Sequence, residues 1–195
     1  NLFRYEISAS LAVDGGGNVL FSRFVAEYSR DTQHEFQQVS PSGAMVAIPT
    51  RNPPALKAIS ASSNGVTLGI TSSAVYRRDL AGGWIRLAGD PNASGFRDGV
   101  GAEARFSSLQ AITSDRGGDF YLLDYQLTDQ GRHSGEYLIR KLTDGGAVST
   151  VGQKRIGLPL GLATNSQGTF FLTDPERNVV AQIDPQGNET VIGGS

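Results

Sequence analysis

Apolar and polar residues alternate along most of this chain in short runs, separated by turns that contain glycine. An alternation with a period of two is typical of β-strands that bury one face. One phrase, an apolar run followed by a polar turn with glycine and a second apolar run, occurs four times. The copies read SLAVDGGGNVLF from Ser10, AISASSNGVTLGI from Ala58, AITSDRGGDFYLL from Ala111 and GLATNSQGTFFLT from Gly161. No segment of helical period competes with this pattern, so the sequence predicts an all-β fold.

The spacing of these copies indicates a repeat protein. Their turn glycines Gly17, Gly65, Gly118 and Gly168 lie 48, 53 and 50 residues apart. A fixed period of this size is the signature of stacked structural units, none of which can bury its apolar face alone. Each unit continues into two further apolar segments around a second turn, such as Asp184-Pro185-Gln186-Gly187. Four antiparallel strands per unit are typical of a propeller blade.

We therefore predict a β-propeller of four four-stranded antiparallel blades in a single domain covering residues 1–195. The small apolar residues of the first strands suit a position near the axis, where strands converge. The predicted blades cover roughly residues 8–50, 55–88, 107–152 and 159–195, and a connection loop covers 89–106.

The repeated phrase resembles the NHL repeat family of β-propellers, whose usual pattern is Gly-Val-Ala-Val-Asp, two or three residues, and Gly-Asn-Leu-Tyr-Val-Ala-Asp. Leu11–Phe21, Ala111–Asp124 and Gly161–Asp174 follow that pattern closely, and Ala58–Ile70 is a degenerate copy. The stretch GFRDGVGAEARF at 95–106 is similar to the connection between blades in bacterial members, where Gly-Phe-x-Asp-Gly-x-Gly leads into Ala-x-Phe. The resemblance implies a propeller and an interaction module.

The family usually has about six blades, whereas this chain has four units. Three arrangements would explain the difference: a genuine four-bladed propeller, part of a larger propeller of about six blades, or a ring completed by a second chain. An open arc would expose two sheet faces that ought to be buried. We therefore favour closure of the ring within the chain.

Composition excludes several classes of function. The formal charge of −2 and the pI near 5.7 supply no general attraction for nucleic acid. Cysteine is absent, which excludes disulfides, thiolate metal sites and cysteine catalysis. No apolar stretch approaches the roughly 18 residues needed to cross a membrane. The chain begins with Asn rather than Met, so we expect a processed start and, with the bacterial-type resemblance, a periplasmic or extracellular location.

Two enlarged connections between second and third strands are the best candidates for function. Arg23–Glu35 in the first unit and Tyr125–Gly135 in the third both mix Tyr, Arg and His, residue types suited to an interface. Equivalent positions of successive blades emerge on one face, so we expect these connections to act together. Asp124 and Asp174 occupy the family position at the end of the second strand. The candidate binding residues are Tyr28, Arg30, His34, Asp124, Tyr125, Arg132, His133, Asp174 and Arg177.

These observations favour a non-catalytic propeller that binds a protein or peptide, or else a saccharide. The alternative is a propeller enzyme of the lactonase-like hydrolase or amidating-lyase type with a metal on the axis. Such a site needs carboxylates, histidines or asparagines at strand starts, and the strand starts here are largely apolar or Ser/Thr. We predict no catalytic residue, no metal and no cofactor.

Overall fold

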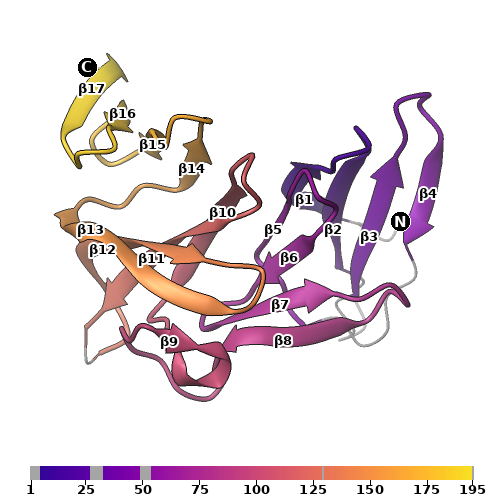
Figure 1. Ribbon diagram of the computed structural model, residues 1–195, viewed down its shortest axis with the longest axis horizontal. Helices are drawn as coiled ribbons and strands as arrows, with labels where there is room; N and C mark the ends of the chain where they lie inside the picture. Colours follow the sequence, from indigo (N-terminus) through magenta and orange to yellow (C-terminus); the bar gives the residue numbers. More distant parts are fainter. Residues whose placement is uncertain (1–4, 27–32, 49–53, 129, 195) are drawn as a thin grey trace.

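The computed structural model describes residues 5–26, 33–48, 54–128 and 130–194. Its strands form four antiparallel sheets, which follow one another around a common axis as the blades of a β-propeller (Figure 1). Within each blade the four strands pair in chain order. The all-β fold and the four four-stranded blades predicted from the sequence are confirmed.

The strands are assigned to blades as follows. Blade 1 contains β1 (Tyr5–Val13), β2 (Val19–Ala26), β3 (Gln33–Val39) and β4 (Met45–Ile48). Blade 2 contains β5 (Ala58–Ala61), β6 (Thr67–Ile70), β7 (Ala74–Arg78) and β8 (Trp84–Gly89). Blade 3 contains β10 (Leu109–Ser114), β11 (Phe120–Leu127), β12 (His133–Leu142) and β13 (Ala147–Ile156). Blade 4 contains β14 (Gly161–Thr164), β15 (Phe170–Asp174), β16 (Val179–Ile183) and β17 (Glu189–Gly194).

The repeated turns explain why the glycines recur. In the turn after β1, the Gly17 N–H donates to the Asp14 carbonyl at 3.0 Å, and the Asp14 carboxylate accepts the Asn18 N–H at 2.9 Å. In blade 4 the Asn165 side chain takes the equivalent position, and its Oδ1 accepts the Thr169 N–H at 3.0 Å. Gly17 and Gly168 have φ of +76° and +78°, a left-handed conformation that disfavours residues with a Cβ. The backbone of these turns therefore requires glycine at the aligned positions.

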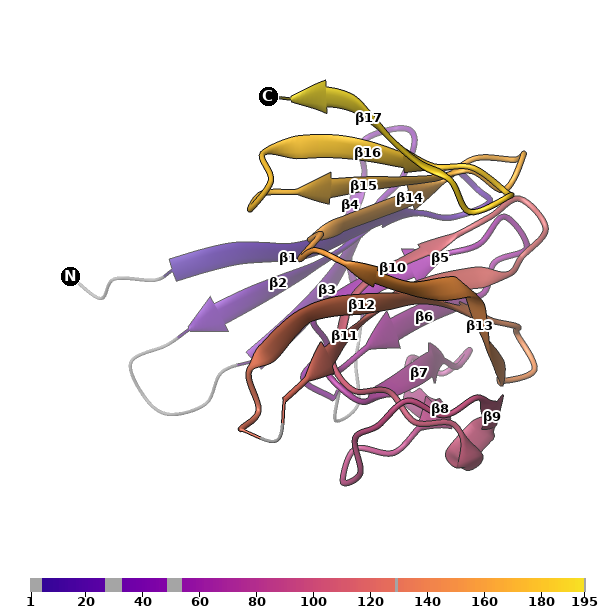
Figure 2. The same cartoon turned by 90° about the vertical axis from the view of Figure 1, so that its left-hand side faces the viewer.

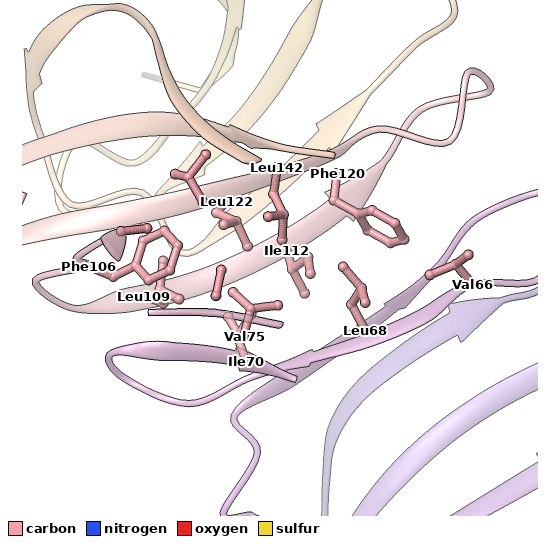
Figure 3. Close-up of a cluster of buried hydrophobic side chains, with 13 residues drawn as sticks. Val66, Leu68, Ile70, Val75, Phe106, Leu109, Ile112, Phe120, Leu122 and Leu142 are labelled. Carbon is pink, nitrogen blue, oxygen red and sulfur yellow. The ribbon is translucent and has the colours of Figure 1, made fainter. Parts of the chain in front are cut away.

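Apolar cores lie between consecutive blades. One joins blades 1 and 2, a second joins blades 2 and 3, and a third joins blades 3 and 4. Figure 3 shows the second core, to which blade 2 contributes Leu68 and Ile70 and blade 3 contributes Ile112, Phe120 and Leu122. All five side chains are at most 8% exposed. Blades 2 and 3 are thus covered on both faces.

Contact between blades runs in series along the chain. The innermost strands contact each other as β1 with β5, β5 with β10 and β10 with β14. Figure 2 shows blade 4 alongside blade 3, and Figure 1 places blades 4 and 1 at the two ends of the series. In the part of the chain that the structure describes, no apolar core joins blade 4 to blade 1. The closure that we expected within the chain is not made by these residues.

The connection between blades 2 and 3 contains a strand that the sequence did not predict. β9 (Gly99–Val100) pairs with β13 and adds a fifth strand to the sheet of blade 3. A single 3-10 turn, η1 (Gly101–Glu103), follows it. The connection is therefore anchored along the outer edge of blade 3. None of the described residues forms a helix long and apolar enough to span a membrane.

Candidate functional site

The predicted binding residues belong to one end of the propeller. We call this end the second-strand rim and define it by the carboxyl ends of β2, β6, β11 and β15. Asp124 and Tyr125 lie near the end of β11, Asp174 ends β15, and Arg177 follows in the turn before β16. His34 and His133 lie at the same end of these hairpins, near the starts of β3 and β12, where they pair with Phe24 and Leu127.

The described residues of the two enlarged connections are mainly strand, which corrects the expectation of free loops. β2 continues to Ala26 and β3 begins at Gln33, while β11 continues to Leu127 and β12 begins at His133. The extra residues lengthen two hairpins because backbone pairing continues, with Phe24 opposite His34 in the first of them. His34 and His133 are therefore strand residues, and not loop residues as predicted.

The structure brings only some of the predicted residues together. Tyr28 and Arg30 lie outside the described residues. Arg132 is exposed in the turn after β11, where its N–H donates to Thr128 Oγ1 at 3.3 Å. Tyr125, Asp174 and Arg177 lie close to the junction of blades 3 and 4, whereas Asp124 lies at the junction of blades 2 and 3.

Tyr125 is a buried residue rather than an exposed loop residue. Its side chain is 2% exposed, and its hydroxyl donates a hydrogen bond to the carbonyl of Pro159, in the connection that leads to blade 4. Burial raises the pKa of Tyr125 above its usual value, and the negative charge of Asp174 adds to the effect. Tyr125 therefore stays neutral and ties blade 3 to the next connection.

Asp124 holds a buried ionic network at the outer side of the blade 2–3 junction. Its Oδ1 accepts the N–H groups of Ser107 and Ser108, each at 2.9 Å. Its Oδ2 accepts a hydrogen bond from Arg140 Nη1 at 3.1 Å, and Arg140 Nη2 reaches Asp98 Oδ1 at 2.7 Å. Asp124 and Arg140 are fully buried, whereas the Asp98 side chain is half exposed.

The network pins the connection loop to blade 3. Burial raises the pKa of Asp124 to about 7, against the opposing effects of the Ser108 and Ser107 N–H groups and of Arg140. For Asp98, hydrogen bonds from Thr150 and Arg140 outweigh burial and hold the pKa below its usual value. Both carboxylate oxygens of Asp124 accept hydrogen bonds from the protein itself. Asp124 therefore stabilises the fold and does not face a ligand.

Asp174 forms a second network inside blade 4. Its Oδ1 accepts the N–H groups of Glu176 and Arg177 at 3.1 and 3.2 Å, which fixes the turn after β15. Its Oδ2 accepts a bond from Arg177 Nε at 2.8 Å, and Arg177 Nη1 lies 2.8 Å from a Glu189 carboxylate oxygen. Burial opposes ionisation of Asp174, but the Arg177 interactions outweigh it and hold the pKa below its usual value. Asp174 and Arg177 therefore position the rim rather than offer free charges.

A cavity opens beside these networks at the junction of blades 3 and 4. This rim cavity has a volume of about 300 Å³. Its walls combine aliphatic side chains, a tyrosine ring and two polar side chains: Gln110, Tyr125, Leu158, Leu160, Pro175 and Glu176. Leu160 is 59% exposed, so an apolar side chain stands at the mouth of the cavity.

A second hollow, the outer cavity, adjoins the first. It has a volume of about 400 Å³ and shares Leu160 and Pro175 with the rim cavity. Thr173 and Val180 from the uncovered face of blade 4 also line it. Leu158, Leu160 and Pro175 are not among the binding residues predicted from the sequence. The apolar run Leu158-Pro159-Leu160, placed in a connection between strands, is the signal that could have identified two of them.

The donor chemistry of the described residues does not build a metal centre. In that part of the chain, no three His, Cys, Asp or Glu side chains gather in a group that could hold a metal ion. An axial metal of the kind expected for the enzyme alternative needs such a group.

Comparisons with known proteins identify the fold. No family model matches the chain, and no curated protein matches its sequence. An auxiliary nutrient binding protein from Bacteroides ovatus matches with a TM-score of 0.62 and 16% identity over 95% of this chain and 48% of its own. Regucalcin, a calcium-binding protein from Agrobacterium tumefaciens, matches with a TM-score of 0.59 and 15% identity over 95% of this chain and 58% of its own.

A third similar structure contains a bound peptide. YCF48 bound to D1 peptide has a TM-score of 0.51 and 15% identity over 95% of this chain and 52% of its own. At these identities the likeness shows the fold alone, and it places the chain among the β-propeller proteins. The chain spans about half the length of the nutrient binding protein and of YCF48.

Proposed function

We propose that residues 1–195 form an NHL-like propeller domain that binds a protein or peptide segment at the second-strand rim and catalyses no reaction. The rim cavity carries this proposal. It lies among residues from the same end of the propeller that the sequence singled out, and Tyr125 belongs to both sets. The repeated phrase and the connection at 95–106 support the NHL assignment.

The chemistry of the cavity favours a peptide over a saccharide. Leu158, Leu160 and Pro175 give it aliphatic walls, which suit an apolar side chain. Glu176 is exposed beside them, so a basic side chain or a backbone N–H of the ligand would find an acceptor there. A saccharide would need several convergent polar groups, and Asp174 and Arg177 are already paired with each other at 2.8 Å.

Propellers of similar structure provide precedents for binding. They include a nutrient binding protein and YCF48 bound to D1 peptide. Tyr28, Arg30, His34, Arg132 and His133 are proposed as further contacts along the same rim. A periplasmic or extracellular partner accords with the bacterial-type repeats.

A display library of random linear peptides, selected on the immobilised chain, tests the proposal. Leu160→Ser should weaken binding of the selected peptides by about tenfold or more, because an apolar anchor buried on binding contributes at least about 1.4 kcal/mol. Glu176→Gln should weaken it less, because Glu176 is exposed. Leu80→Ser is the matched control, since Leu80 is fully exposed in the turn after β7, and its affinity should equal that of the wild type.

Three results would contradict this proposal. The library could yield no enriched peptide, or the selected peptides could bind the Leu160 and Glu176 variants as tightly as the wild type. Selective binding to a glycan array, without peptide enrichment, would assign the rim to saccharides instead.

A further inference from the structure

One position of the repeat lies at the second-strand rim in blades 2, 3 and 4. It is the fifth residue before the one whose carbonyl accepts the N–H of the turn glycine, and it is Lys57, Gln110 and Leu160 in these blades. The Lys57 N–H donates to the Ile70 carbonyl at 2.7 Å. In the same way the Leu160 N–H donates to the Thr173 carbonyl at 2.8 Å. Both acceptors lie at the carboxyl ends of second strands, so this position belongs to the rim.

Two of these three equivalent residues already belong to the proposed binding site, because Gln110 and Leu160 both line the rim cavity. In blade 3 the position is a β-bulge. Leu109 and Ala111 pair with β11, whereas Gln110 between them has no partner in the register. A bulge turns its side chain away from the regular alternation of the strand and is common beside binding sites. The third equivalent residue, Lys57, therefore occupies a position that the rim uses for contact with a ligand.

Lys57 brings a positive charge to the edge of the rim cavity. Its Nζ donates to the Leu109 carbonyl at 3.3 Å, across the junction from blade 2 to blade 3. Leu109 is joined directly to Gln110 in the cavity wall. The inner strands β5, β10 and β14 contact one another in that order around the axis (Figure 1). The repeated position thus presents a cation, an amide and an aliphatic group in succession along the rim.

The charge of Lys57 is not neutralised by the described residues. Asp174 and Arg177 at the same rim pair with each other, whereas no described carboxylate pairs with Lys57, and the Leu109 carbonyl is its only side-chain hydrogen-bond partner among them. The residue as a whole is exposed, but its ammonium end is partly buried against blade 3, and this burial lowers the pKa of Lys57 below its usual value. An anion bound there would replace the hydration that the ammonium has lost.

The neighbouring amide cannot take the place of this cation. Gln110 Nε2 donates to Ser108 Oγ at 2.9 Å and lies 3.3 Å from the Ser108 carbonyl oxygen. Its amide oxygen is left for a ligand, and this atom accepts hydrogen bonds but donates none. A carboxylate that reaches this part of the rim is therefore directed to Lys57, whereas a backbone N–H is directed to Gln110.

We propose that the peptide bound at the rim carries an acidic residue about three positions from its apolar anchor, and that Lys57 binds the carboxylate of that residue. This inference rests on the proposed function, with the anchor in the rim cavity. Packed sheets lie about 10 Å apart and an extended chain advances about 3.3 Å per residue, so about three residues lead from the cavity wall on blade 3 to Lys57 on blade 2. Glu176 belongs to blade 4, so the two charges would fix the direction of the peptide across the rim.

Reversal of the charge at Lys57 tests this proposal. Random linear peptides selected on the wild-type chain should be enriched in Asp or Glu at one position near the apolar anchor, whereas selection on Lys57→Glu should enrich Lys or Arg at that position. A peptide selected on the wild type, with its acidic residue replaced by Lys, should bind the wild type about three- to tenfold more weakly. The same peptide should bind Lys57→Glu more tightly than the original peptide does.

Arg116→Glu is the matched control and should keep the wild-type preference, because Arg116 is exposed in the turn after β10, at the opposite end of the propeller. Lys57→Met keeps most of the aliphatic stem and should lose the acidic preference without gaining a basic one. Far-UV circular dichroism checks that the variants fold. Selected peptides without acidic enrichment, or an acidic preference that persists in Lys57→Glu, would overturn this proposal and leave the rim as a peptide site. A library that yields no peptide on either protein would overturn the proposed function as well.

Discussion

Replacing Arg140 by Met should destabilise the protein by an amount that depends on pH. Arg140 is 1% exposed and bridges Asp124, which is fully buried, to Asp98, which is half exposed. At about pH 8.5, above the raised pKa of Asp124, the substitution leaves a buried carboxylate without its cation, which costs about 3–5 kcal/mol. At about pH 5 the Asp124 carboxyl is already protonated in the wild type, so the loss falls to about 1 kcal/mol, chiefly the partly screened contact with Asp98.

The direction of this pH dependence follows from the pKa of Asp124 in the folded wild type and in the folded variant. Burial raises it to about 7 in the wild type although Arg140 opposes the shift, and removal of Arg140 raises it further. The variant therefore gains protons relative to the wild type as the pH rises through neutrality, and its deficit in unfolding free energy grows.

Urea unfolding measures this deficit. At the higher pH the midpoint should fall by about 1–2 M. Lys141→Met is the control, because the ion pair between Lys141 and Asp119 is more than 30% exposed on both sides. It should cost at most about 1 kcal/mol at either pH. An equal loss at both pH values for Arg140→Met, or a loss below about 1 kcal/mol at the higher pH, would refute the reasoning.

Three further predictions concern the core, the turns and the rim. Leu68→Ala leaves a cavity at a fully buried position and should lower the unfolding free energy, measured in urea, by about 2–5 kcal/mol. Leu80→Ala, at an exposed position, should change it by less than about 0.5 kcal/mol. Equal effects would contradict the assignment of the core. Gly65→Ala, at φ +85°, should cost about 1–2 kcal/mol in thermal unfolding, while Gly145→Ala, which meets no atom closer than 3.9 Å, should not destabilise. Asp174→Asn should cost about 1–3 kcal/mol in unfolding free energy at neutral pH. Because the pKa of Asp174 is lowered in the fold, this deficit should shrink as the pH falls below the usual aspartate value of about 3.9. A deficit that does not change with pH would show that charge is not its cause.

The blades were predictable because each depends on local rules. Alternation with a period of two assigns the strands, and the turns after β1 and β14 need a left-handed residue, so Gly17 and Gly168 mark the repeat in the sequence. The strand β9 was not predictable in the same way. It is only two residues long and exists because Ala147 and Val148 on another hairpin pair with it.

The candidate site was harder to predict because it depends on long-range contacts. The sequence predicts Tyr125 as an exposed loop residue. In the structure its hydroxyl donates a hydrogen bond to the carbonyl of Pro159, 34 positions later in the chain. Asp124 resembles a ligand-facing carboxylate until Arg140 is seen to cover it. The sequence supplies both members of each pair, but only the packing of blades and connections brings them into contact.

Titration of a library-selected peptide into the wild-type chain and into the Leu160→Ser variant tests the central claim most directly. The account predicts saturable binding to the wild type and binding weakened by about tenfold or more in the variant, because Leu160 stands at the mouth of the rim cavity. Equal affinity for the two proteins would contradict it, since the rim cavity would then contribute nothing to binding.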